Sequence, residues 1–177
     1  SEIVPHTITA AEVSARKPAE IIFSGGPKSV HVEGAPVIDP EVYELGTRIL
    51  GICYRAQLIA QQLDGGVVAN TGVGEYGRTE MTVSNRGVVF GGGQPLQQQV
   101  WMSHFDSISV APDGFTVTAS TATTPVAAME HVERRIQFFD DAGGAKSIQV
   151  QSEQHAERRD DVDAGACQNP PNIHFLE

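Results

Sequence analysis

The sequence predicts an α/β fold, with an open, mixed or parallel central sheet, flanking helices and a β-rich second half. Two observations support this prediction. Up to about residue 70, short apolar segments that are typical of buried strands alternate with helical segments, which is the pattern of parallel βαβ units. Beyond that point, short apolar segments follow one another between turn residues, which is the pattern of antiparallel strands.

In the first half, the end signals of each element are visible. Thr9 and Glu12 form a capping-box pattern for a short helix, which Pro18 ends. A buried strand over residues 20–23 leads into a glycine-rich turn, and Pro40 opens a short helix that runs to about residue 45. An apolar strand over 48–52, a helix over about 54–63 and a short strand over 67–69 follow.

In the second half, we expect a run of short strands. Residues 79–83 and 87–90 are separated by a hairpin-like spacer, and further strands are expected over 97–102, 107–110, 115–120, 126–130 and 147–150. We therefore predict one domain over residues 1–150 and a polar tail over 151–177.

The composition narrows the class of function. The chain has 177 residues and a net charge of −10, which disfavours nucleic acid or an anionic membrane as the main partner. No apolar run approaches the ~20 residues that span a bilayer. The two cysteines, Cys53 and Cys167, do not suggest a disulfide framework, so we expect a cytoplasmic protein. No cysteine and histidine spacing predicts a metal site.

Cys53 is the best candidate nucleophile. It follows an apolar strand and precedes a helix, so the order is that of a nucleophile elbow, with Gly51 suited to the crowded turn. The N-terminus of the helix would favour the thiolate. The alternative is a small buried cysteine with no chemical role.

A thiolate nucleophile needs an oxyanion hole and a base. Backbone N–H groups of the glycine-rich segment 24–27 could face a developing oxyanion from the side opposite the Tyr54 N–H, although this segment can also be a plain tight turn. His155 and Glu157 form a His-x-Glu pattern after the last expected strand, and the alternative is a solvated histidine. His104 could line the pocket or satisfy a loop.

Taken together, these motifs resemble the class I glutamine amidotransferase family, whose fold is flavodoxin-like, and in particular the amidotransferase domain of GMP synthases. The matching segments cover about residues 1–136, and they are 22–30, 50–54 with Gln57, 75–80, 100–104 with Asp106, and 126–130. By this resemblance the chain starts after the first βα unit of the family, and residues 137–177 do not match it.

The resemblance implies a chemistry for these residues. Cys53 would attack the side-chain amide of glutamine and form a thioester, with Gly26 and Tyr54 as oxyanion donors. Gln57, Ser103 and His104 would hold the amino-acid end of glutamine. The domain itself would need no cofactor. The ammonia would pass to an ATP-pyrophosphatase (synthetase) domain or subunit, which uses ATP and magnesium to aminate XMP to GMP.

Three departures from the family pattern fall at the site. Arg55 stands where a glycine is expected and would crowd the turn, and Phe105 also replaces a glycine. The His-Pro-Glu motif is not intact. One alignment leaves Gln151 and Glu153 at its positions, and the alignment that we prefer gives His155 and Glu157.

The sequence therefore supports two main hypotheses. The first is the glutaminase part of a GMP synthase, which would also be able to form a homodimer. The second is a catalytically impaired scaffold that binds glutamine or a synthetase partner, as the three departures suggest. A third hypothesis, a cysteine hydrolase on another α/β scaffold, fits the segment 101–104 poorly.

Overall fold

A computed structural model describes residues 1–26, 29–69, 74–91, 93–139 and 172–176. Three short helices and eleven strands occur in these parts of the chain. They are β1 (Glu2–Pro5), α1 (Ala10–Arg16), β2 (Glu20–Phe23), the 3-10 helix η1 (Pro40–Glu44), β3 (Arg48–Ile52), α2 (Tyr54–Gln62), β4 (Gly66–Ala69), β5 (Glu75–Val83), β6 (Gln97–His104), β7 (Asp106–Val110), β8 (Thr116–Ser120), β9 (Ala128–His131), β10 (Ile136–Phe139) and β11 (Asn172–Leu176).

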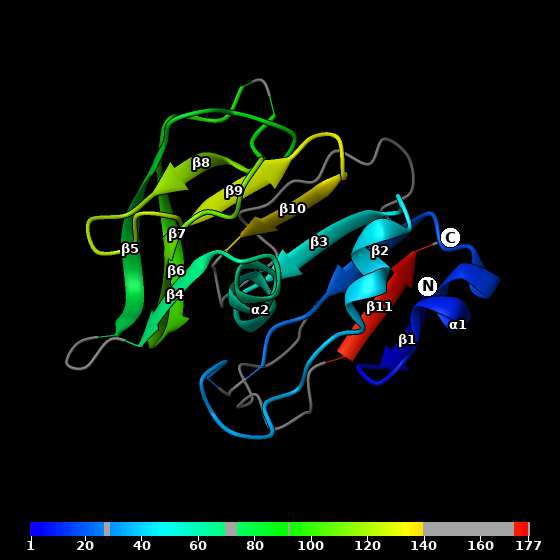
Figure 1. The fold of residues 1–177 in the computed structure, drawn as a ribbon. Helices are drawn as coiled ribbons and strands as arrows, with labels where there is room; N and C mark the ends of the chain where they lie inside the picture. The colour runs from blue at the N-terminus through cyan, green and yellow to red at the C-terminus, as the bar shows by residue number, and fades with distance from the viewer. Residues whose placement is uncertain (27–28, 70–73, 92, 140–171, 177) are drawn as a thin grey trace, which may run out of the picture.

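The described strands form a large mixed sheet, as the sequence predicts (Figure 1). Its order is β1-β11-β2-β3-β10-β9-β8-β5-β6. The pairs β2–β3 and β3–β10 are parallel, and the pairs from β10 to β6 are antiparallel. A second, two-stranded sheet pairs β4 with β7. The carboxyl ends of β2 and β3 therefore meet at one edge, where ligand sites of open α/β sheets are found.

The last described strand, β11, lies between β1 and β2 and is antiparallel to both. Since β1 and β2 run in the same direction, β11 interrupts a parallel arrangement. Ile173 and Phe175 are buried there and belong to the main core. This strand was not predicted, because five residues after a polar segment show too little periodicity to identify one.

The helix α2 is the central element of the site, and it is buried on almost every side. It contacts β3 and β10 of the large sheet and β4 and β7 of the small one. Its residues from Tyr54 to Ala60 are all buried. The helix α1 begins with the predicted capping box, in which Thr9 accepts from the Glu12 backbone and the Glu12 side chain accepts from Thr9.

One strand prediction is wrong, and the strand β10 was not predicted. Residues 87–90 form a turn, and β5 pairs with β6 instead. The cause is a side-chain contact: the Val88 N–H donates to Glu130 Oε2 at 2.7 Å, and Gly87 has a φ of +50°. The buried strand β10 was missed, because Gln137 interrupts its apolar residues and no glycine, proline or asparagine marks a turn in front of it. The predicted strand over 147–150 lies outside the described residues.

Candidate active site

Cys53 occupies the turn between β3 and α2 with a backbone conformation that is rare for a residue with a side chain. Its φ is +52° and its ψ is −119°. Such a conformation costs about 1–3 kcal/mol and persists only where the surrounding structure imposes it. The strand before it and the helix after it impose it here, and the strand, strained turn and helix form the predicted nucleophile elbow.

Backbone hydrogen bonds hold both sides of Cys53. Its N–H donates to the Phe139 carbonyl of β10 at 3.0 Å, and its carbonyl accepts from Ala56 N at 2.7 Å and from Gln57 N at 3.2 Å. The first bond ties the elbow to the sheet, and the other two start α2. The nucleophile candidate is therefore attached to the two most buried elements of the domain.

Gly51 allows the helix to return close to its own strand. A Cβ at this position would lie 2.5 Å from Ile59 Cδ1 of α2 and 3.3 Å from Phe138 Cβ. Such contacts are too short for any side chain to be accommodated without movement. The crowding that the sequence suggested for this turn is therefore real, and it is located at position 51.

The glycine-rich loop after β2 lies directly against the thiol. A Cβ on Gly25 would be 3.3 Å from Cys53 Cβ and 3.9 Å from Cys53 Sγ. The backbone of this loop therefore lies beside Cys53, in the place where an oxyanion hole would need its N–H donors. The thiol is 8% exposed. Gly26 follows in the same loop, and Tyr54 is the first residue of α2, so its N–H has no acceptor one turn back in the helix.

Arg55 does not strain the turn, although the sequence suggested that it would. It lies within the regular part of α2, so the left-handed conformation falls on Cys53 instead. Its side chain is fully buried, and its guanidinium lies 5.5 Å from the centre of the Tyr54 ring. Burial lowers the pKa of Arg55, and the neighbouring Tyr54 and Tyr43 oppose this effect.

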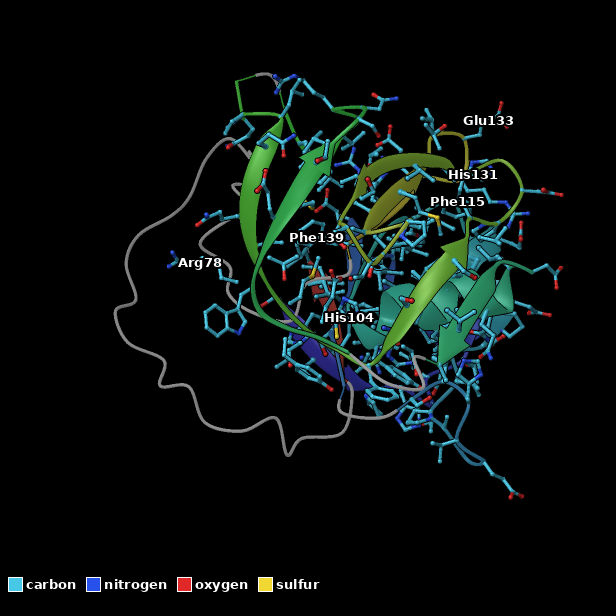
Figure 2. All side chains as sticks on the ribbon, turned by 90° about the vertical axis from the view of Figure 1, so that its left-hand side faces the viewer. Arg78, His104, Phe115, His131, Glu133 and Phe139 are labelled. Atoms are coloured by element: carbon cyan, nitrogen blue, oxygen red, sulfur yellow. The ribbon has the colours of Figure 1, made fainter. Side chains whose placement is uncertain are left out.

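Two of the predicted substrate-binding side chains, Gln57 and His104, contact the same backbone carbonyl. Of the two, Figure 2 labels His104. Gln57 Nε2 donates to the Asp106 carbonyl at 2.9 Å, and His104 Nδ1 lies 2.9 Å from the same oxygen. Both side chains are buried, at 3% and 5% exposure. Ser103 lies on the opposite, exposed face of β6, so the structure does not bring its side chain into this group. The roles of all three in substrate binding stay predictions.

Glu75, on the neighbouring strand β5, adds a carboxylate that sequence reasoning did not place in the site. Its oxygens accept from Thr121 Oγ1 at 2.6 Å and Thr124 Oγ1 at 2.8 Å, and Oε2 lies 3.3 Å from His104 Nε2. Burial raises the pKa of Glu75, but hydrogen bonds from threonine hydroxyls and the nearby His104 lower it overall. Only the position of Glu75 in the segment 75–80 could have indicated it.

A family of known proteins matches most of this chain. The family model for class I glutamine amidotransferases matches residues 1–139. The chain belongs to the class I glutamine amidotransferase family.

Relatives of this chain include proteins described as glutamine-hydrolysing GMP synthases. One from Parafrankia is 56% identical over 136 residues, and one from Streptomyces avermitilis is 55% identical over 136 residues. Each match covers 77% of this chain but only 25% and 26% of the respective relatives. The chain thus spans about a quarter of their length.

Solved structures agree with the amidotransferase fold. A protein from Thermoplasma acidophilum, described as part of a GMP synthase, has 34% sequence identity and a TM-score of 0.60, and the match covers 78% of this chain and 68% of that one. A glutamine amidotransferase from Methylobacillus flagellatus has 16% identity and a TM-score of 0.56 over 71% of this chain and 52% of that one, so it supports the fold alone.

The predicted base and its partner lie outside the region of the family match. His155 and Glu157, like Gln151 and Glu153 of the other alignment, fall outside the described residues and beyond residue 139. Their role stays a prediction. Phe105, the second expected departure, occupies the bend between β6 and β7, where its side chain is 47% exposed. Among the described residues, no group of three or more His, Cys, Asp and Glu side chains gathers as a metal site.

Proposed function

We propose that this amidotransferase is the glutaminase part of a GMP synthase, in which Cys53 releases ammonia from glutamine. The observation that carries the proposal is the elbow: Cys53 has a φ of +52° at the start of α2, and its thiol faces the backbone of Gly25. The relatives from Parafrankia and Streptomyces avermitilis, described as glutamine-hydrolysing GMP synthases, supply the reaction class.

In the proposed reaction, the Cys53 thiolate attacks the side-chain carbonyl carbon of glutamine. The carbonyl oxygen becomes an oxyanion, which the N–H groups of Gly26 and Tyr54 stabilise. His155, oriented by Glu157, takes the thiol proton and gives it to the departing nitrogen, so that ammonia leaves and a glutamyl thioester remains. Water then hydrolyses the thioester, and the products are glutamate and ammonia.

The ammonia would be used elsewhere. Because the chain spans about a quarter of the relatives' length, we propose that a synthetase domain or subunit receives it. That partner would bind ATP and magnesium and aminate XMP to GMP. We further propose that this reaction takes place in the cytoplasm.

A glutamine analogue with an electrophilic diazoketone in place of the amide tests the proposal. We expect it to alkylate Cys53 with saturation kinetics and free glutamine to protect the thiol. Cys53→Ala should abolish the labelling, and Cys167→Ala serves as the matched control that should leave it unchanged. If a folded sample is not labelled at Cys53, the proposed function is wrong.

A second candidate function, a scaffold that binds glutamine without turnover, is favoured by one observation: the family match ends before His155. Steady-state release of ammonia separates the two candidates. The enzyme hypothesis expects turnover that His155→Ala lowers by at least about 100-fold, in the range of general-base contributions. His31→Ala, an exposed histidine, is the control. Labelling without turnover would support the scaffold instead.

A further inference from the structure

The carboxylate of Glu75 is held in one orientation. It accepts hydrogen bonds from Thr121 and Thr124, which lie in the segment after β8, and its side chain is 11% exposed. The remaining contact of Oε2 is His104 Nε2 at 3.3 Å. A carboxylate that is fixed by two hydroxyl donors cannot turn away from the imidazole without breaking these bonds.

Both ring nitrogens of His104 therefore face oxygen acceptors. Nε2 faces Glu75, and Nδ1 faces the Asp106 carbonyl at 2.9 Å. A neutral imidazole has only one N–H and can donate to only one of them, whereas the imidazolium donates to both. A neutral ring that donates from Nδ1 to the Asp106 carbonyl leaves Nε2 unprotonated, and a second proton would be placed on Nε2, beside the Glu75 carboxylate.

Burial and two neighbouring acidic residues act on the pKa of His104. Burial is the largest cause and lowers the pKa of His104 overall, whereas Glu75 of β5 and Asp106 of β7 partly oppose it, and the charge of Glu75 is the largest single opposing cause. The third neighbour, Gln57 of α2, is uncharged. Among the charged neighbours, Glu75 therefore has the largest single effect on the protonation of His104.

The contact continues from His104 to the helix of the nucleophile. The Asp106 carbonyl accepts from Gln57 Nε2 as well as facing His104 Nδ1, so two side chains fix one carbonyl. Gln57 lies four residues after Cys53, and its own N–H donates to the Cys53 carbonyl at 3.2 Å. A continuous path of polar contacts thus joins Glu75 to the first turn of α2.

We propose that Glu75 is a positioning residue, whose fixed carboxylate draws a second proton to His104 Nε2 and holds the ring with Nδ1 toward the Asp106 carbonyl that Gln57 also contacts. Its effect on glutamine rests on the function proposed above. The segment 103–106 and Gln57 are expected to bind the amino-acid end of glutamine, so loosening them should weaken glutamine binding and leave the reactivity of the thiol unchanged.

The first test follows the ring of His104 and needs no activity. Nitrogen-15 NMR of labelled histidines, with the His104 signal assigned by its loss in His104→Asn, gives the titration midpoint of the ring. Glu75→Gln should lower this midpoint by about one pH unit or more, because a carboxylate within hydrogen-bond range raises it by that amount. Glu80→Gln, which removes a charge from the exposed face of the same strand, should not change it.

The second test separates binding from thiol reactivity. Glu75→Gln should slow the labelling of Cys53 by the glutamine analogue about tenfold at low concentration, and leave alkylation by iodoacetamide unchanged. Thr124→Val, which removes one hydrogen bond to Glu75, should have a smaller effect in the same direction. It replaces Glu75→Gln as the test variant if Glu75→Gln does not fold.

An unchanged His104 midpoint overturns the inference, and so does an equal fall in both alkylation rates, which a general loss of structure would produce. If the analogue does not label the wild-type chain, the proposed function fails, but the His104 titration still decides the role of Glu75.

Discussion

Gly25 lies against Cys53 so closely that a Cβ at position 25 would be 3.3 Å from Cys53 Cβ. The two residues come from the ends of neighbouring parallel strands, β2 and β3, and their contact places loop backbone beside the thiol. A larger residue at either position would separate the loop from the sulfur. This relationship gives the first prediction.

Gly25→Ala should slow the labelling of Cys53 by a glutamine analogue more than it destabilises the fold. A contact of 3.3 Å requires the loop to shift by a few tenths of an ångström, and the loss of one well-placed oxyanion donor costs about 100-fold in rate. We expect a decrease of about 10- to 100-fold with a change in unfolding free energy below about 1 kcal/mol. Gly91→Ala is the control, because a Cβ there would meet nothing within 4 Å. A normal labelling rate in Gly25→Ala would contradict the proposed arrangement.

Gly51→Ala should destabilise the domain by about 1–3 kcal/mol, the range for an overpacked core. The added methyl group would lie 2.5 Å from Ile59 Cδ1, so the buried Ile59 side chain or the helix that carries it has to move. Chemical denaturation measures the change. Ile59→Val removes the atom concerned, and the double variant should therefore lose less stability than the sum of the single variants. Strict additivity would show that the two positions do not clash.

His6 should make the stability of the domain sensitive to mild acid. Burial and the nearby Arg55 lower the pKa of His6, so the unfolded chain binds its proton at a higher pH than the folded chain does. Stability is unaffected well above the unfolded value of about 6.5 and falls as the pH drops below it. His6→Asn should flatten the dependence of unfolding free energy on pH between about 7 and 5. His31→Asn is the comparison, and an equal flattening in both variants would exclude a specific role for His6.

Phe175→Ala should destabilise the domain by about 3–5 kcal/mol. The side chain is 3% exposed and pairs in register with Ile21 of β2 and Glu2 of β1. Thermal or denaturant unfolding gives the change. Phe105→Ala removes an aromatic ring that is 47% exposed and should cost much less. Equal, small effects of the two substitutions would mean that β11 is not part of the sheet.

Much of the local structure could be predicted from the sequence, because the residues that determine it are close together in the chain. The capping box of Thr9 and Glu12, the first-turn position of Pro40 and the elbow around Cys53 depend on residues within one turn of each other. The mixed sheet and the class I amidotransferase family were predicted and are confirmed.

Contacts between segments that are far apart in the chain could not be predicted from the sequence. The Glu130 carboxylate that turns residues 87–90 away from a strand comes from 42 positions further along the chain. Glu75 meets Thr121 and Thr124 across 46 and 49 positions. A carboxylate next to a tyrosine and a glycine has no local feature that indicates such partners.

The sequence by itself determined the family, the nucleophile candidate and the alternation of helices and strands, because these follow from local patterns of apolar, glycine and capping residues. Only the tertiary structure decided that Cys53 carries the strained conformation, that Arg55 is buried without straining the turn, and that β11 lies between β1 and β2. The physical reason is that strain, burial and strand order depend on which surfaces pack together, and packing joins residues that are far apart in the chain.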